Sequence, residues 1–274
     1  MTVASAAVDL CDEVREHCAA IAAGARWVRI DPHADVEPGG RAGLDPELHM
    51  LDGAPEEVAR YVLLLDAINF GSGWFAELGT DTDALTEALT AHCREHGVSS
   101  SFDVAAVLAL PREHELTRLY GEALRQLDAW LAEHDPLAFG SADALARALA
   151  PMPFYADTGF YKRAQITAND LVLAGVAHFP DVDRLTAFAD NLVPHVLRVA
   201  GMLSYAPELA ARVDAGEELP AGGEMEAEIR ACAVHACELL AARWGVAPRV
   251  LDNWLWNRGR HIGGLPHITK TVFY

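Results

Sequence analysis

A lysine and an arginine stand side by side between aromatic and apolar residues in the segment FYKRAQI, residues 160–166. Basic residues are scarce in this chain, which has 21 Lys+Arg against 40 Asp+Glu and a formal net charge of -19. Such a pair can hold a phosphate or a carboxylate in a partly dry pocket, or it can pair with surplus carboxylates of the chain itself. On a helix, Lys162 shares a face with Gln165 and Ile166 while Arg163 points elsewhere, so we expect the two cations to have different roles.

A second group of polar and aromatic residues lies in the segment LLLDAINF, residues 63–70. Asp66, Asn69 and Phe70 stand at i, i+3 and i+4, which places them on one face of a helix. A buried Asp in an apolar run is costly unless it has a partner. The three side chains either bond local backbone near a helix end or converge on a flat heterocycle, with the Gly-Ser-Gly break at 71–73 allowing close backbone approach.

A third candidate is Asp190 in the segment FADNLVP, residues 188–194. Pro194 fits the first turn of a following helix, with Asp190 or Asn191 as its cap. The carboxylate of Asp190 is therefore either a structural cap or a catalytic group kept ionised beside a positive helix end.

Two features near the C-terminus have mainly structural interpretations. Glu226 and Arg230 are spaced i, i+4, which is typical of a solvated helix face, whereas Glu228 precedes an apolar run and can turn inward. The segment 251–256 and the final residues Phe273 and Tyr274 indicate packing, with a docked chain end.

The elements that must position these residues are mostly helices. Apolar residues recur at helical spacing in five ranges: 56–69, 81–96, 113–134, 160–178 and 224–244. Asp81 or Thr82, Ser141 and Asp181 are candidate N-caps. Strand signals are confined to residues 27–30 and 269–274. The sequence predicts a mainly α protein, a single domain over residues 1–274, with a small β ribbon.

Composition narrows the function further. The acidic balance argues against a nucleic-acid duplex as the main partner, because no basic patch is visible. Five cysteines without a CxxC spacing indicate reduced thiols in a cytoplasmic protein, and the scattered histidines form no HxxxH or HExxH pair, so we expect no metal site. The charged first residues do not resemble a signal peptide, and no stretch is long enough to span a bilayer.

The order of several segments resembles the queuosine salvage protein family. They are YVLLLDAINF, FYKRAQI, FADNLVPHVLRVAGMLSY, EAEIRACAVHACELL, LDNWLWNRG and PHITKTVFY, from about residue 45 to the last residue. The sequence departs from eukaryotic members at residues 191–192, where they tend to have an aromatic-basic pair, and at residues 71–73, where they carry bulkier residues. Neither departure touches Asp190 or Lys162, but both change the expected rim of the pocket.

The resemblance implies an all-helical fold similar to helix-hairpin-helix DNA glycosylases and hydrolysis of queuosine 5′-monophosphate to queuine and ribose 5-phosphate. The free base can then be returned to tRNA. By position in the family motif, Asp190 is the carboxylate that stabilises positive charge at the anomeric carbon and orients or deprotonates water. Lys162 is expected to contact the ribose or the phosphate, or to pair with Asp190. No cofactor is expected, and neither a stable nucleic-acid complex nor a membrane partner.

The remaining expected site residues would hold the substrate. Asp66 and Asn69 suit the amide and amine edge of the 7-deazaguanine base, on which Phe70, Trp74 or Tyr161 would stack. Glu228 is a carboxylate suited to the secondary ammonium of the base, and His49 and His267 are lesser candidates, the latter for the phosphate. The alternatives are a queuine- or nucleotide-binding protein without catalysis, a base glycosylase acting on DNA or tRNA, and a helical scaffold.

Overall fold

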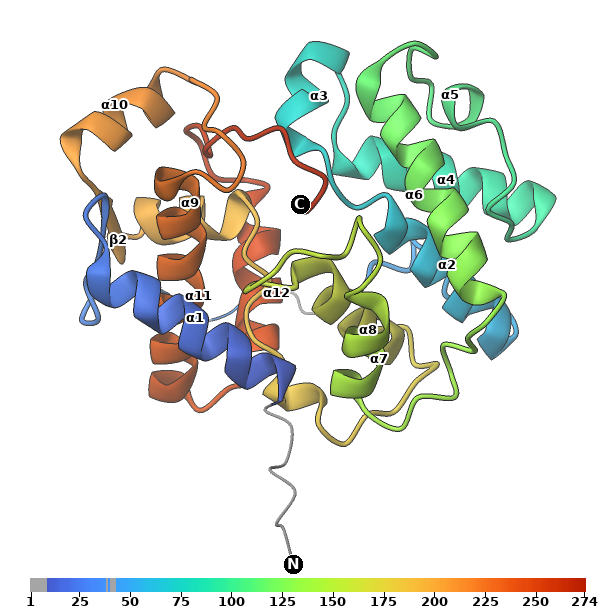
Figure 1. Cartoon of the computed structure of the whole chain (residues 1–274), viewed down its shortest axis with the longest axis horizontal. Helices are drawn as coiled ribbons and strands as arrows, with labels where there is room; N and C mark the ends of the chain where they lie inside the picture. The colour runs from blue at the N-terminus through green and yellow to red at the C-terminus, as the bar shows by residue number, and fades with distance from the viewer. Residues whose placement is uncertain (1–8, 38, 40–42) are drawn as a thin grey trace, which may run out of the picture.

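The computed structural model describes residues 9–37, 39 and 43–274 and is mainly α-helical (Figure 1). The helices of the first part are α1 (Leu10–Gly24), α2 (Pro55–Ala67), α3 (Ser72–Leu78), α4 (Thr82–His96), α5 (Val104–Val107), α6 (Glu115–Leu131), α7 (Ala142–Leu149) and α8 (Lys162–Leu173). Then follow the 3₁₀ turn η1 (Val182–Arg184), α9 (Leu192–Val199), α10 (Pro207–Asp214), α11 (Glu224–Trp244) and α12 (Pro248–Gly259). All five ranges expected to be helical contain a helix, so the mainly α prediction is confirmed.

Side-chain caps explain where several helices begin. Asp81 accepts a hydrogen bond from the N–H of Ala84, and Ser141 accepts one from Ala144, so both expected caps are confirmed. Asp181 has a different role from the expected one. It precedes η1 without capping it, and its carboxylate instead accepts the N–H groups of Ala142 and Asp143 at the start of α7.

The apolar side chains form two cores that lie side by side. The larger core is built mainly by α1, α2, α4, α6, α7 and α8. The smaller one is built mainly by α9, α11 and α12 together with the β ribbon, which lie together on the left in Figure 1. Helix α11 contributes to both, since Ala231 and Val234 pack in the larger core and Ile229 and Ala233 in the smaller one.

The small β ribbon is present, but only half of it was anticipated. Strand β1 (Val28–Ile30) pairs antiparallel with β2 (Leu203–Tyr205), with Arg29 opposite Ser204. The expected strand at 269–274 is wrong, because that segment has no ladder partner and runs as extended chain between the two groups of helices.

The last residues are nevertheless firmly docked. Tyr274 is buried, and its carbonyl oxygen accepts the N–H of Gly71 at 2.9 Å. A Cβ atom on Gly73 would lie 2.3 Å from the carbonyl oxygen of Thr269, so only glycine fits there. The Gly-Ser-Gly break therefore lets the C-terminal segment of the chain pack closely against its backbone. The sequence indicated a close backbone approach here but not which segment would make it.

Burial also accounts for the cysteines. All five thiols are buried and free, and burial raises the pKa of Cys93 to about 11 and of Cys232 to about 12, so they are unreactive thiols. Within the described ranges of the chain, no helix is both long and apolar enough to cross a membrane.

Candidate active site

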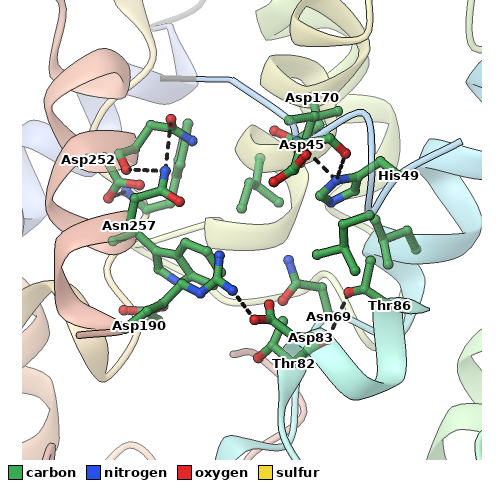
Figure 2. Close-up of a pocket in the computed structure, with 18 of the residues that line it drawn as sticks. Asp45, His49, Asn69, Thr82, Asp83, Thr86, Asp170, Asp190, Asp252 and Asn257 are labelled. Carbon is green, nitrogen blue, oxygen red and sulfur yellow. Dashed lines mark hydrogen bonds and ion pairs between the residues drawn. The ribbon is translucent and has the colours of Figure 1, made fainter. Parts of the chain in front are cut away.

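A cavity of about 710 Å³ lies between the two groups of helices. Its volume falls within the range of small-molecule sites, about 300–1,000 Å³. Figure 2 shows Asp190, Asp252 and Asn257 on one side and Asn69, Thr82 and Thr86 on the other. Its polar lining includes Asp45, His49, Asp66, Asn69, Thr82, Asp83, Thr86, Lys162, Asn169, Asp170, Asp190, Asp252, Asn253, Asn257, Arg258, Arg260 and His261.

Asp190 lies on the loop that leads into α9 and lines the cavity. Its Oδ1 accepts the N–H groups of Leu192 at 2.8 Å and Val193 at 3.1 Å, so the carboxylate caps the positive end of this helix. Oδ2 makes no hydrogen bond with any described residue and is available to a ligand. The cap and the ligand-facing carboxylate, which the sequence left as alternatives, are therefore two functions of one group.

Lys162 is the first residue of α8 and lines the same cavity, with 4% of its surface exposed. Burial lowers the pKa of its ammonium group, while the negative charge of Asp190 opposes that shift. No carboxylate of the described residues forms a close ion pair with it. The preceding Tyr161 has a φ of 48°, a conformation that non-glycine residues rarely adopt and that is enriched at functional sites.

Three more buried carboxyl groups surround this lysine. Burial raises the pKa of Asp170 to about 7, and burial together with the negative charge of Asp190 raises the pKa of Asp252 to about 8. Burial, and then the charge of Asp170, also raise the pKa of Asp66 well above its ordinary value. Asp66, Asp170 and Asp252 form, with Asp190, an acidic cluster. Part of this acidic cluster is therefore neutral at pH 7 and can donate hydrogen bonds.

Asp66 stands out within the cluster. It is 1% exposed, lines the cavity, and neither of its carboxyl oxygens has a hydrogen-bond partner among the described residues. An unpartnered buried carboxyl group is costly in an empty protein and becomes favourable when a ligand supplies the missing donors or acceptors. Its position therefore fits the recognition of a polar ligand edge.

Three other expected site residues also line the cavity. Asn69 lies just after α2, and Phe70 packs edge-on against Tyr120 with ring centroids 4.9 Å apart. His49 is on the loop before α2, where its Nδ1 lies 2.9 Å from the carbonyl oxygen of Asp45 (Figure 2). The structure thus brings six of the ten expected side chains together.

Two of the expected aromatic contacts are located elsewhere. Trp74 is buried in the larger core and does not line the cavity. Tyr161 also lies outside the lining, and its ring packs beside the same core. Of the three aromatic residues expected to stack on the base, Phe70 alone lines the cavity.

Glu228 and His267 also lie outside the cavity. The carboxylate of Glu228 accepts backbone N–H groups of residues 26–28, at 2.6 Å in the case of Trp27. His267 is buried against Tyr274, with Nε2 3.1 Å from the phenol oxygen, and burial lowers its pKa to about 3. A neutral imidazole of this kind is poorly suited to bind phosphate, and Glu228 is already occupied by the β ribbon.

The sequence left open that Arg163 pairs with a surplus carboxylate of the chain, but it forms no ion pair with any carboxylate of the described residues. Its guanidinium group donates to the backbone carbonyls of Asp66, Ala67, Phe154 and Val272. It therefore caps the C-terminal end of α2, where a cation is favourable, and fixes the backbone of the cavity residue Asp66. The two adjacent cations do have different roles, as their directions on a helix predicted.

The sequence did not identify several residues of the cavity. Asp252, Asn253, Trp256 and Asn257 come from α12, whose segment 251–256 was interpreted as packing. Asn169 and Asp170 follow Lys162 on α8 by seven and eight residues, and this helical spacing is the signal that could have located them.

The fold and the cavity define a helical protein with a ligand cavity built from carboxyl groups, amides and one buried lysine. The family model described as queuosine salvage protein matches residues 153–274. A relative from Sphaerobacter thermophilus, named queuosine 5′-phosphate N-glycosylase/hydrolase, is 35% identical over 83% of this chain and 84% of its own length. The chain belongs to the queuosine salvage protein family.

Two eukaryotic relatives with the same name match a shorter region. The protein from Dictyostelium discoideum is 40% identical over 42% of this chain and 40% of its own length. The protein from Mus musculus is 34% identical over the same shares of both chains.

Proposed function

We propose that this chain hydrolyses the N-glycosidic bond of queuosine 5′-phosphate, releasing queuine and ribose 5-phosphate. The observation that carries the proposal is the presence of Asp190, with a free Oδ2, and the buried Lys162 in one cavity with the unpartnered Asp66. The names of the relatives support the same reaction. The buried thiols suit a reducing compartment, so we place the reaction in the cytoplasm.

The bond between base and ribose breaks with development of positive charge at the anomeric carbon. In the proposed reaction, Asp190 stabilises this charge and takes a proton from the water that attacks the carbon. The bonding electron pair leaves with the base, which takes a proton from a neutral carboxyl group of the cluster. Asp252, with a pKa of about 8, is protonated at neutral pH and is our candidate for this donor.

The acidic cluster also suits the base itself. We assign Asp66 and Asn69 to its amide and amine edge, with Phe70 against the ring. The secondary ammonium group of queuine needs a carboxylate, and because Glu228 lies outside the cavity we assign this contact to Asp170. His49, on the same wall, is retained as a polar contact to the ligand.

The 5′-phosphate cannot share the deepest part of the cavity with several carboxylates at low cost. Two guanidinium groups, Arg258 and Arg260, line the cavity at a more exposed position near the end of α12. We assign the phosphate to these groups, because guanidinium can bind phosphate through paired hydrogen bonds. Lys162 then lies nearer the ribose and Asp190.

One experiment tests the reaction. The purified protein is incubated with queuosine 5′-phosphate, with unphosphorylated queuosine and with queuosine-containing tRNA, and free queuine is measured by mass spectrometry. We expect release from the nucleotide and none from tRNA, because a small cavity in a strongly acidic protein does not suit a polyanion. Absence of release from all three substrates would refute the proposal, and release from tRNA alone would favour a glycosylase acting on the polymer.

A further inference from the structure

The Glu226–Arg230 pair, expected on a solvated helix face, is buried between the two cores. Arg230 is 3% exposed and Glu226 is 2% exposed. The guanidinium group lies 4.0 Å from the ring centroid of Phe160 and 4.6 Å from that of Tyr274. The expectation of a surface pair was wrong because other elements cover α11 on nearly all sides. The helix therefore lacks the solvent-exposed polar face that the i, i+4 spacing predicted.

The main partner of Arg230 is a carboxylate distant in sequence. Its two terminal nitrogens donate to both carboxylate oxygens of Asp157, at 3.1 and 2.5 Å. Its Nε donates to the backbone carbonyl of Ala189 at 3.1 Å. Three hydrogen bonds from one planar group thus tie two separate loops to α11, and Nη1 also lies 3.4 Å from Glu226 Oε1 on the same helix.

Each of these two loops carries one member of the proposed catalytic pair. Ala189 immediately precedes Asp190 in the chain. Asp157 receives a weak hydrogen bond from the backbone N–H of Lys162, with 3.4 Å between nitrogen and Oδ2. The backbone carbonyl of Asp157 also accepts the N–H of Tyr161 at 2.6 Å, so it holds the strained residue before the lysine.

Apolar packing places Phe160 of one loop and Phe188 and Ala189 of the other in the larger core, but the helices that follow the two loops pack in different cores. Helix α8, which begins at Lys162, packs on α2 and α7 in the larger core. Helix α9, which follows Asp190, packs on α11 and α12 in the smaller core. The hydrophobic effect is non-directional, whereas a bidentate ion pair sets distance and angle.

A buried ion pair is a weak source of stability, because desolvation offsets most of its attraction, whereas it specifies geometry well. We propose that Arg230 is a positioning residue that, through Asp157 and the carbonyl of Ala189, holds Lys162 and Asp190 in their reactive arrangement. It does not itself line the cavity. The inference rests on the proposed function, since the arrangement matters only if those two groups act together.

The variant Arg230→Lys tests this role with little change of charge. A lysine ammonium group is a compact donor and cannot serve both Asp157 oxygens and the Ala189 carbonyl in the same geometry. Small displacements of positioned groups can cost about 10²-fold in rate. We expect kcat to fall by at least about tenfold with KM for queuosine 5′-phosphate nearly unchanged, because the ligand-binding side chains remain.

Backbone amide hydrogen exchange gives a second measurement, which does not depend on turnover. The amides of Leu192 and Val193, bonded to Asp190, and that of Lys162 should exchange faster in Arg230→Lys than in the wild type. The matched control is Thr90→Val, which removes the buried hydrogen bond of 2.6 Å between Thr90 and Tyr61, far from these loops. It should lower Tm without changing kcat or the exchange of those amides.

The outcomes separate the two proposals. A wild-type protein without turnover refutes the proposed function, and the exchange measurement then still decides whether Arg230 holds the two loops. Retained kcat with unchanged exchange in Arg230→Lys would overturn the positioning role. An equal loss of kcat in Thr90→Val at an equal loss of Tm would overturn it as well, because general destabilisation would then explain the effect.

Discussion

Arg260 at the end of α12 forms an ion pair with Asp83 on α4, across the cavity from one group of helices to the other (Figure 2). The two side chains are 31% and 40% exposed, so the pair stands where the cavity opens to solvent. A partly exposed pair of this kind contributes little to stability. Arg260 can therefore exchange its carboxylate partner for the phosphate of a ligand at small cost.

Replacing Arg260 should consequently discriminate between nucleotide and nucleoside. In Arg260→Ala we expect KM for queuosine 5′-phosphate to rise by about tenfold, since a hydrogen bond to a charged group contributes about 1.5–3 kcal/mol. The KM for unphosphorylated queuosine should remain the same. Initial rates of queuine release over a range of concentrations give both values.

The control for this variant is Arg125→Ala, which removes another exposed arginine, paired with Glu122 on α6 away from the cavity. It should leave both KM values unchanged. If Arg260→Ala raises KM equally for the two substrates, the phosphate is bound elsewhere.

The variant Asp190→Asn should bind the substrate but not turn it over. An asparagine oxygen can still accept the N–H groups of Leu192 and Val193, so α9 begins as before, but the negative charge that faces the anomeric carbon is lost. We expect kcat to fall by at least about 10³-fold. Binding is followed as the rise of Tm on addition of queuosine 5′-phosphate.

Asp181→Asn is the matched control, because Asp181 also accepts two backbone N–H groups at a helix start, at 2.7 and 3.0 Å, and does not line the cavity. Its kcat should equal that of the wild type. An active Asp190→Asn enzyme would show that another carboxyl group of the cluster performs the reaction.

The variant Lys162→Met separates two roles of the lysine. If the ammonium group acts with Asp190 near the ribose, kcat should fall by about 10²-fold or more on nucleotide and nucleoside alike. A rise of KM confined to the nucleotide would instead show that Lys162 binds the phosphate. Methionine fills a similar volume, so the buried site should stay packed, which the Tm of the variant would verify.

Helix content was predictable because it depends on local periodicity. The range 224–244 was identified to the residue, since α11 begins after a glycine-rich break and ends before Gly245. The strand predicted at residues 269–274 was wrong, because β-branched and aromatic residues fit an extended chain equally well with or without a partner strand. The partner of β1 is instead more than 170 residues away in sequence, a separation that no local pattern encodes.

Residues of the site could be predicted only where they lie within a recognisable sequence motif. Asp190, Lys162 and Asp66 stood out as charged residues in apolar surroundings, and all three line the cavity. Glu228 was also expected to turn inward, yet it is buried for a structural reason, and Arg230, expected on a solvated face, is buried as well. Residue type alone does not show which partner a buried charge has. Asp252 escaped notice because its role depends on the packing of α12 against the loop that bears Phe188, whose N–H it accepts at 2.8 Å.

Glu228 should therefore matter for stability and not for substrate affinity. In Glu228→Gln, the charge that binds the N–H groups at the start of β1 is lost, and we expect a loss of about 1–3 kcal/mol in the free energy of unfolding. Denaturant unfolding measures this loss, and KM for queuosine 5′-phosphate should not change. A higher KM with unchanged stability would show that Glu228 contacts the substrate after all.

The raised pKa values of the acidic cluster predict that the protein loses both activity and stability as pH rises from about 7 to 9. Burial raises the pKa of Asp252 to about 8 in the folded protein, against an ordinary value of 3.8, so between these pH values the folded state binds more protons than the unfolded one. Its contribution to stability is complete below about 4 and is lost as pH rises through 8. His267, neutral in both states above pH 7, does not contribute in this range.

Measurements of Tm and kcat at intervals of pH between 7 and 9 check this prediction. Asp252→Asn cannot ionise, so its Tm should depend less on pH than that of the wild type, by up to about 1.4 kcal/mol per pH unit in free energy for one proton. Its kcat should be low throughout, because the amide cannot supply the proton that the leaving base requires. Equal pH dependence of Tm in the two proteins would show that Asp252 is ionised in the folded state at neutral pH, and the proton donor would then have to be Asp170 or Asp66.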